Sequence, residues 1–150
     1  KARSYMPELV LTTDIIVGFP GETAEDFAET LSLVERVRYD AMFTFIFSPR
    51  EGTPAAAMPD PVPREEKQRW FDTLVETANR ISAEKHAEYA GRRLRVLVDG
   101  ETGRGEYNLS ARTNGGRLVH LKGEPELVGR FIEAEITDWN TWALYGVPAL

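Results

Sequence analysis

The sequence contains no cysteine among its 150 residues. This absence excludes disulfide bonds, a thiol nucleophile, and any zinc or iron–sulfur site with cysteine ligands within the chain. Histidine is nearly absent as well, since His86 and His120 are the only two. We expect His86 on the surface of a helix, because no residue of metal-binding type lies one helical turn away. The residues therefore predict no metal site of their own.

Long hydrophobic runs are also missing. No apolar stretch approaches the ~18 residues that a membrane-spanning helix needs, and no signal peptide is apparent. The chain begins with Lys1-Ala2-Arg3-Ser4-Tyr5, which lacks an initiator methionine and has the pattern of the middle of a helix. We therefore expect a fragment of a longer cytoplasmic protein that makes no contact with a membrane.

The excess of acidic residues is confined to the first part of the chain. The formal net charge is −6, yet residues 91–150 contain eight basic and eight acidic residues. Seven of these eight basic residues are arginines. A neutral segment does not attract polyanions in general, but arginines gathered on one face can still bind phosphate.

Residues 1–90 have the pattern of an α/β fold. A hydrophobic strand over residues 10–17 ends in the turn Gly18-Phe19-Pro20-Gly21. The strand carries β-branched residues at positions of both parities, which predicts burial on both faces, as in a parallel sheet. Thr23 and Asp26 then form a capping-box pattern at the start of an amphipathic helix.

A second strand over residues 42–47 completes a βαβ unit, so the two strands should be parallel. Both strands then end at one edge of the sheet, where residues 18–22 and 48–53 face each other. Small molecules bind at such edges in α/β folds, but the glycines can equally serve a tight turn. Arg50 at this edge either binds a carboxylate or phosphate or lies in a solvated turn.

A proline-rich link over residues 55–63 leads into a long helix over residues 64–90, and the composition changes at Gly91. Five short strands separated by glycine and asparagine turns follow, which predicts a small antiparallel β-barrel. The predicted strands span residues 94–98, 107–113, 117–121, 130–137 and 142–147.

Two neighbouring strands of this barrel carry polar and basic side chains. Because Asn108, Ser110 and Arg112 are evenly spaced, they should share one face. Arginine for phosphate, with amides and hydroxyls for sugars and bases, is typical of a barrel that binds nucleic acid. A solvated outer face of an antiparallel sheet is the alternative. The candidate residues for RNA binding are Asn108, Ser110, Arg112, Thr113, Arg117, His120 and Lys122.

Two motifs resemble the radical SAM methylthiotransferase family: residues 13–23, which read TDIIVGFPGET, and residues 45–55, which read FIFSPREGTPA. Residues 91–150 resemble the TRAM domain of those enzymes, through Leu109-Ser110-Ala111-Arg112-Thr113 and Arg117-Leu118-Val119-His120. The resemblance implies an α/β segment followed by an all-β segment. Residues 1–90 would hold the last βα units of a TIM-like radical SAM barrel with a linking helix, and residues 91–150 an OB-like RNA-binding barrel.

The same resemblance implies a function. The longer enzyme would add a methylthio group to carbon 2 of N6-isopentenyladenosine beside the tRNA anticodon, using S-adenosylmethionine and two [4Fe-4S] clusters. The TRAM barrel would bind the tRNA anticodon stem-loop. The CxxxCxxC motif is absent here, so this chain alone should be inactive and should need the missing N-terminal part. A stand-alone RNA-binding module is one alternative, and a sister enzyme acting on threonylcarbamoyladenosine or a ribosomal protein is another.

The resemblance also implies which residues face S-adenosylmethionine, while no residue here would act as a catalytic acid or base. The expected cofactor-binding residues are Gly18, Phe19, Pro20, Gly21, Glu22, Phe45, Phe47 and Arg50. Two strands taken from a parallel barrel expose edges and apolar faces, so self-association of the chain is also expected.

Overall fold

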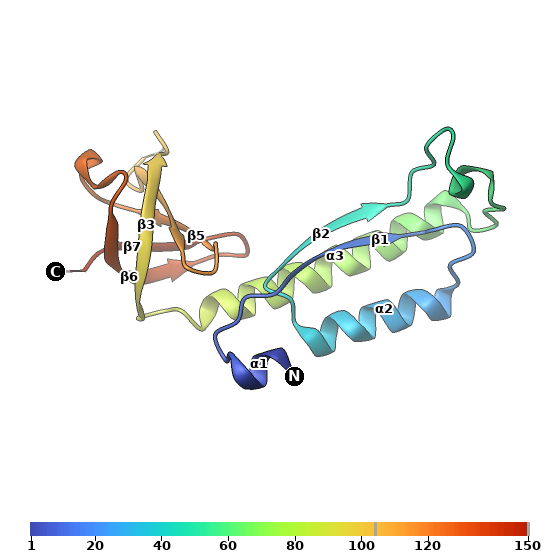
Figure 1. Ribbon diagram of the computed structural model, residues 1–150, viewed down its shortest axis with the longest axis horizontal. Helices are drawn as coiled ribbons and strands as arrows, with labels where there is room; N and C mark the ends of the chain where they lie inside the picture. Colours follow the sequence, from blue (N-terminus) through green and yellow to red (C-terminus); the bar gives the residue numbers. More distant parts are fainter. Residues whose placement is uncertain (104, 150) are drawn as a thin grey trace. The chain divides into compact units, whose positions relative to one another are not determined.

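A computed structural model describes residues 1–103 and 105–149 (Figure 1). The chain divides into two compact units, which we call the βαβ unit (residues 10–81) and the barrel unit (residues 1–9 and 82–150). Arg104 and Leu150 fall within the predicted second domain, 91–150, but lie outside the described residues. No helix in the described ranges is both long enough and apolar enough to cross a membrane.

The βαβ unit has the predicted order of elements. It contains β1 (Thr12–Val17), α2 (Ala24–Val37), β2 (Ala41–Ile46), the 3₁₀ helix η1 (Pro54–Ala57) and the beginning of α3 (Arg64–Ala87). The two strands are parallel, with Thr12 paired to Ala41 and Val17 paired to Ile46. The last residues of α3, from Ser82 onward, belong to the barrel unit.

Helix α2 begins at the capping box that the sequence predicts. The hydroxyl of Thr23 accepts a hydrogen bond from the Asp26 amide at 3.2 Å, and the Asp26 carboxylate accepts one from the Thr23 amide at 2.9 Å. These bonds satisfy two amides that the first helical turn cannot pair by itself. The helix ends at Arg38, which has a left-handed backbone (φ 51°) and donates its amide to the Val34 carbonyl.

The core of the βαβ unit lies between the sheet and the two helices. Val17, Val34 and Leu74 are fully buried there. The ring of Phe27 from α2 stacks on Trp70 from α3 at 5.3 Å between centroids, and the planes differ by only 6°. Trp70, Leu74 and Ile81 form the apolar stripe of α3, and this stripe packs in the core of the unit.

The prediction that the first strand is buried on both faces is wrong. Ile16 is 55% exposed, and its register partner Phe45, like Phe43, is exposed on the same face. Side chains of a strand alternate between faces, and α2 and α3 cover only one face of this two-stranded sheet (Figure 1). Among the described residues of the βαβ unit, nothing covers the apolar surface on the other face.

The barrel unit is a closed five-stranded sheet, counted over its described residues. Its elements are α1 (Ala2–Tyr5), β3 (Arg93–Glu101), β4 (Leu109–Thr113), β5 (Leu118–Leu121), the 3₁₀ helix η2 (Pro125–Leu127), β6 (Phe131–Trp139) and β7 (Leu144–Pro148). The strands close in the order β3-β4-β5-β7-β6. The inward side chains form one core that includes Val98, Leu109, Val119, Ile136 and Leu144.

One strand pairing corrects the expectation of a wholly antiparallel barrel. Four pairings among the described strands are antiparallel, but β5 and β7 are parallel, with His120 beside Tyr145. A closed ring with an odd number of strands cannot alternate in direction all the way around. At least one pair of neighbours must be parallel, and here it is the pair that closes the ring.

We expect the Thr23→Ala substitution to lower the free energy of unfolding of the chain by about 1 kcal/mol, because it removes the N-cap of α2. Thermal unfolding followed by circular dichroism at neutral pH measures this loss. The matched control is Ser32→Ala, which removes an exposed hydroxyl from the middle of the same helix. Equal effects of the two substitutions would contradict the role of the cap.

The capping box should also depend on pH. Hydrogen bonds from the Thr23 backbone and side chain hold the pKa of Asp26 below its ordinary value of 3.8. A lowered carboxyl pKa stabilises the folded state above the unfolded pKa, and this stabilisation is lost as the pH falls through the folded pKa. We therefore expect the difference between Thr23→Ala and the parent chain to shrink below pH 3.8. Melting curves between pH 2 and pH 7 measure it.

Candidate functional site

The turn after β1 is closed by one of its own carboxylates. Gly18 and Gly21 both have positive φ angles, 71° and 89°. The Glu22 carboxylate accepts hydrogen bonds from the Gly18 amide and, at 3.2 Å, from the Phe19 amide. Two backbone amides of the turn are therefore used to hold the turn itself, and Glu22 is a residue that shapes it.

The aromatic residues at this strand end fall into two groups. Phe19 and Phe47 meet edge to face with centroids 5.0 Å apart, beside the buried Pro20. Phe45 instead lies on the exposed face of the sheet, next to Ile16. The structure therefore joins Phe19 to Phe47 and leaves Phe45 available to a flat apolar ligand.

Arg50 lies in an exposed bend after β2. Its carbonyl accepts hydrogen bonds from the Thr53 hydroxyl at 2.7 Å and from the Thr53 amide at 3.2 Å. Its backbone therefore closes a small turn, and its charged group remains exposed at the strand-end edge, as the sequence predicted.

Sequence reasoning missed a buried lysine beneath the glycine turn. Lys67 of α3 is only 5% exposed and forms an ion pair with Asp60. A Cβ atom added to Gly18 would lie 2.5 Å from the Cδ atom of Lys67. Glycine is thus needed at position 18 for two reasons: the Lys67 side chain packs against it, and its backbone has a positive φ angle. A cavity of about 370 Å³ opens beside Lys67, next to Phe47 and Ser48.

On the barrel, strict alternation places the predicted residues. Leu109 and Ala111 of β4 are buried in the barrel core, so Ser110 and Arg112 lie on the outer face. Ser110 pairs with His120 of β5, and His120 pairs with Tyr145 of β7. The outer row Ser110–His120–Tyr145 therefore crosses three neighbouring strands.

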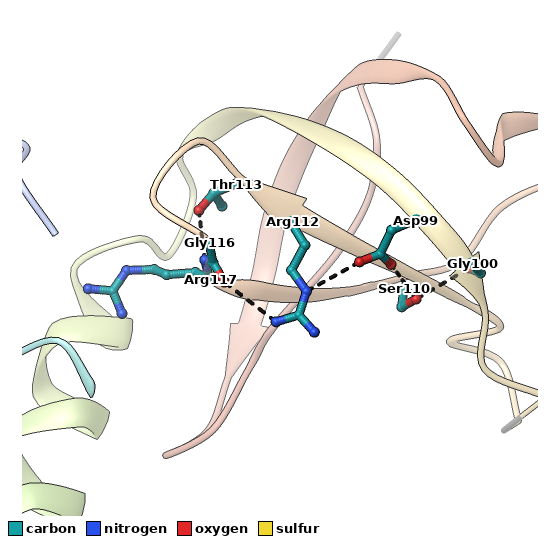
Figure 2. A network of polar contacts seen from close by, with 7 residues as sticks. All are labelled: Asp99, Gly100, Ser110, Arg112, Thr113, Gly116 and Arg117. Carbon is teal, nitrogen blue, oxygen red and sulfur yellow. Dashed lines mark hydrogen bonds and ion pairs between the residues drawn. The ribbon is translucent and has the colours of Figure 1, made fainter. Parts of the chain in front are cut away.

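Arg112 is held in place by an acid that the sequence did not single out. Figure 2 shows Asp99 between Ser110 and Arg112. The Ser110 hydroxyl donates to Asp99 Oδ1 at 2.6 Å, and Arg112 Nε donates to Asp99 Oδ2 at 3.2 Å. Arg112 Nη1 also reaches the Gly116 carbonyl at 3.4 Å. Asp99 orients the guanidinium on the exposed face and partly neutralises its charge.

Two predicted RNA-binding residues are engaged by the backbone. The Asn108 amide group donates to the Gly123 carbonyl at 2.8 Å and accepts from the Gly123 amide at 3.1 Å. The Thr113 hydroxyl accepts from the Arg117 amide at 3.1 Å across the β4–β5 turn. Both residues therefore fix loops of the barrel, which positions their neighbours.

Arg117 does not lie on the exposed face as predicted. It has the same strand parity as the inward-facing Val119 and Leu121, and it is only 7% exposed. Its guanidinium lies 5.0 Å from the ring centroid of Tyr89, and Figure 2 shows it pointing away from that of Arg112. Arg117 thus packs in the barrel unit and offers little surface to a phosphate.

The far end of the same outer face carries an aromatic cluster with a cation. Tyr107 meets Tyr145 edge to face at 4.9 Å, and His120 lies 5.4 Å from Tyr145. Lys122 lies 4.7 Å from the centroid of Tyr107 and 2.6 Å from a carboxylate oxygen of Glu106. The hydrogen bond to Glu106 raises the pKa of Lys122 above its ordinary value, so the ammonium is charged at neutral pH.

The described residues form no recognisable site for a metal ion. In residues 1–103 and 105–149, no group of three or more histidine and carboxylate side chains could hold one. The chain has no cysteine, so no residue here fits an iron–sulfur cluster.

Comparisons with known proteins agree with this geometry. The TRAM domain family matches residues 87–149. Over 146 residues, the chain is 48% identical to the tRNA-2-methylthio-N(6)-dimethylallyladenosine synthase of Thermoanaerobacter sp. (strain X514), covering 97% of this chain and 31% of that protein. The protein of the same name from Oceanobacillus iheyensis is 48% identical over 98% of this chain and 28% of its own length.

A third relative of that name, from Acetivibrio thermocellus, is 44% identical over 97% of this chain and 30% of its own length. These relatives confirm the resemblance that the two motifs and the barrel predicted. The chain spans about a third of the length of the curated relatives it matches.

We expect Gly18→Ala to destabilise the βαβ unit more than Gly21→Ala does. Both substitutions force an alanine into a left-handed backbone, at a cost of about 1–2 kcal/mol. Only Gly18 has Lys67 against the position of the new Cβ atom, whereas Gly21 has nothing within 4 Å. Urea unfolding followed by circular dichroism compares the two. Equal losses of unfolding free energy would show that the Lys67 side chain moves aside at no cost and that packing at Gly18 is unimportant.

Proposed function

Since residues 87–149 form a TRAM domain and the chain resembles tRNA-2-methylthio-N(6)-dimethylallyladenosine synthases along nearly all of its length, we propose that it is the RNA-binding part of such an enzyme. The reaction adds a methylthio group to carbon 2 of N6-isopentenyladenosine beside the tRNA anticodon. The observation that carries the proposal is the outer barrel face, where oriented cations and aromatic rings lie together over neighbouring strands.

This face has the chemistry that RNA requires. Arg112 and Lys122 supply charge for phosphates, and His120 and Tyr145 supply rings and polar edges for unpaired bases. The anticodon stem-loop, which combines a phosphate backbone with unstacked bases, is the partner we assign. The chain as a whole is acidic, so the affinity depends on these placed groups and not on overall attraction.

The βαβ unit would supply one wall of the cofactor pocket. Its exposed apolar face, with Ile16, Phe43 and Phe45, suits the adenine of S-adenosylmethionine, and Arg50 at the strand ends suits its carboxylate. Gly18, Phe19, Pro20, Gly21 and Glu22 would shape the turn that borders this pocket, and Phe47 would brace it. The iron–sulfur clusters of the family do not fit the residues of this chain, so no step of the reaction is assigned to them here.

A second candidate function follows from the missing cysteines. A chain that cannot hold a cluster can still bind RNA, so it can serve as a binding module alone. Sister enzymes that act on threonylcarbamoyladenosine in tRNA or on a ribosomal protein share the first motif, and they differ from the first proposal in their target. Binding to an isopentenylated anticodon stem-loop, compared with an unmodified one, separates them.

We expect no iron–sulfur cluster to form on this chain, because it offers no thiolate ligand. Anaerobic incubation with iron and sulfide, followed by desalting and an absorption spectrum, tests this. A broad iron–sulfur absorption band in the desalted protein, as intense as that of a protein with a full set of cluster ligands, would contradict it. The same preparation should leave S-adenosylmethionine intact under reducing conditions.

We expect Arg112→Ala to weaken binding to an anticodon stem-loop and to reduce the slope of log K against log salt by about 1, as for the loss of one phosphate contact. Fluorescence anisotropy at several salt concentrations measures both. The matched control is Arg93→Ala, which removes the same charge from an exposed position on β3. Equal slopes for both variants and the parent chain would refute a phosphate contact at Arg112.

A further inference from the structure

We propose that Trp142, in the turn between β6 and β7, is a stacking platform for an unpaired base of the bound RNA. This inference rests on the proposed RNA-binding function and names a residue outside the face predicted from the sequence. Trp142 is 73% exposed, although burying a ring of this size is among the largest gains a side chain can make. An indole left in water contributes nothing to the core and is free to take a partner.

The turn that carries Trp142 is built around one side chain. The side-chain oxygen Oδ1 of Asn140 accepts hydrogen bonds from the backbone amide of Trp142 at 2.8 Å and from the backbone amide of Ala143 at 2.9 Å. The Asn140 backbone amide closes the turn on the Ala143 carbonyl at 2.9 Å. The backbone at Trp142 is therefore fixed before any ligand arrives.

Two residues at the end of α3 anchor the same turn. His86 Nδ1 donates to the Asn140 carbonyl at 2.7 Å, and the Ser82 hydroxyl donates to the Thr141 carbonyl at 2.6 Å. The expectation that His86 lies on the surface is wrong, because this bond holds it at 5% exposure. Because two successive carbonyls of the turn accept these hydrogen bonds, the turn loses little conformational freedom when a ligand binds, which favours a rigid platform.

Asn140 also links the turn to the RNA face. Its side-chain NH₂ group donates to the Tyr145 hydroxyl at 2.9 Å, and Tyr145 in turn contacts His120 and Tyr107. Lys122 lies over Tyr107, so a cation is present in the same cluster. A partner that offers both a flat ring and an anionic backbone matches this surface, and single-stranded RNA has both. A protein partner would instead require a contiguous apolar patch.

The test uses the full chain with Trp139→Phe, which leaves Trp142 and the buried Trp70 as fluorophores. Titration with an anticodon stem-loop should quench the Trp142 emission, whereas a blunt RNA duplex should not. Trp142→Ala should weaken binding to the stem-loop about 5- to 150-fold, and Trp142→Phe should retain most of the affinity. Trp139→Ala, at a less exposed position on β6, is the matched control and should bind normally.

Melting temperatures of all variants check that the fold is intact, and the quenching is a readout that a merely structural role would not give. Normal stem-loop binding by Trp142→Ala, without quenching in the parent chain, overturns the stacking platform and leaves the proposed function standing. Failure of every variant and of the parent chain to bind RNA overturns both. A change in sedimentation mass on Trp142→Ala, with RNA affinity unchanged, would identify the turn as a contact between copies and overturn the proposal.

Discussion

The constraint on which the candidate site depends is the closure of the barrel. Because the ring closes, each strand must send alternate side chains into one shared core, and the remaining side chains have no choice of face. Leu109 and Ala111 face inward, which puts Ser110 and Arg112 outward on β4. The parallel pairing of β5 and β7 completes the surface, because it sets His120 beside Tyr145. The outer row and its ring contacts follow from that pairing.

Much of this arrangement could be predicted from the sequence. The capping box at Thr23, the parallel βαβ unit, and the shared outer face of Ser110 and Arg112 follow from local pattern, and the structure has them as predicted. Asn108 precedes β4, and its side chain binds the Gly123 backbone instead. These features depend on neighbours a few residues apart along the chain, or on strict alternation. Local pattern is sufficient wherever the physical cause is local.

The features that escaped prediction depend on residues far apart in the sequence. Lys67 reads as a polar helix position, but packing beneath Gly18 buries it, and it pairs with the exposed Asp60. The role of Asp99 in orienting Arg112 and the burial of His86 against Asn140 join segments that only the fold brings together. Two other features could have been predicted from the sequence. Five strands in a closed ring require one parallel pair, and the alternation continued back from Val119 places Arg117 inward.

The candidate interface separates residues that build the surface from residues that remain to act on a partner. Two cations of the candidate interface each lie beside an acid, with Arg112 beside Asp99 and Lys122 beside Glu106. Such pairs orient the cations and cancel part of their charge, so a phosphate must share or replace the carboxylate. Simple polyanions gain little from this exchange. An RNA that also stacks a base gains an interaction that salt does not screen, which favours a folded loop over an arbitrary strand.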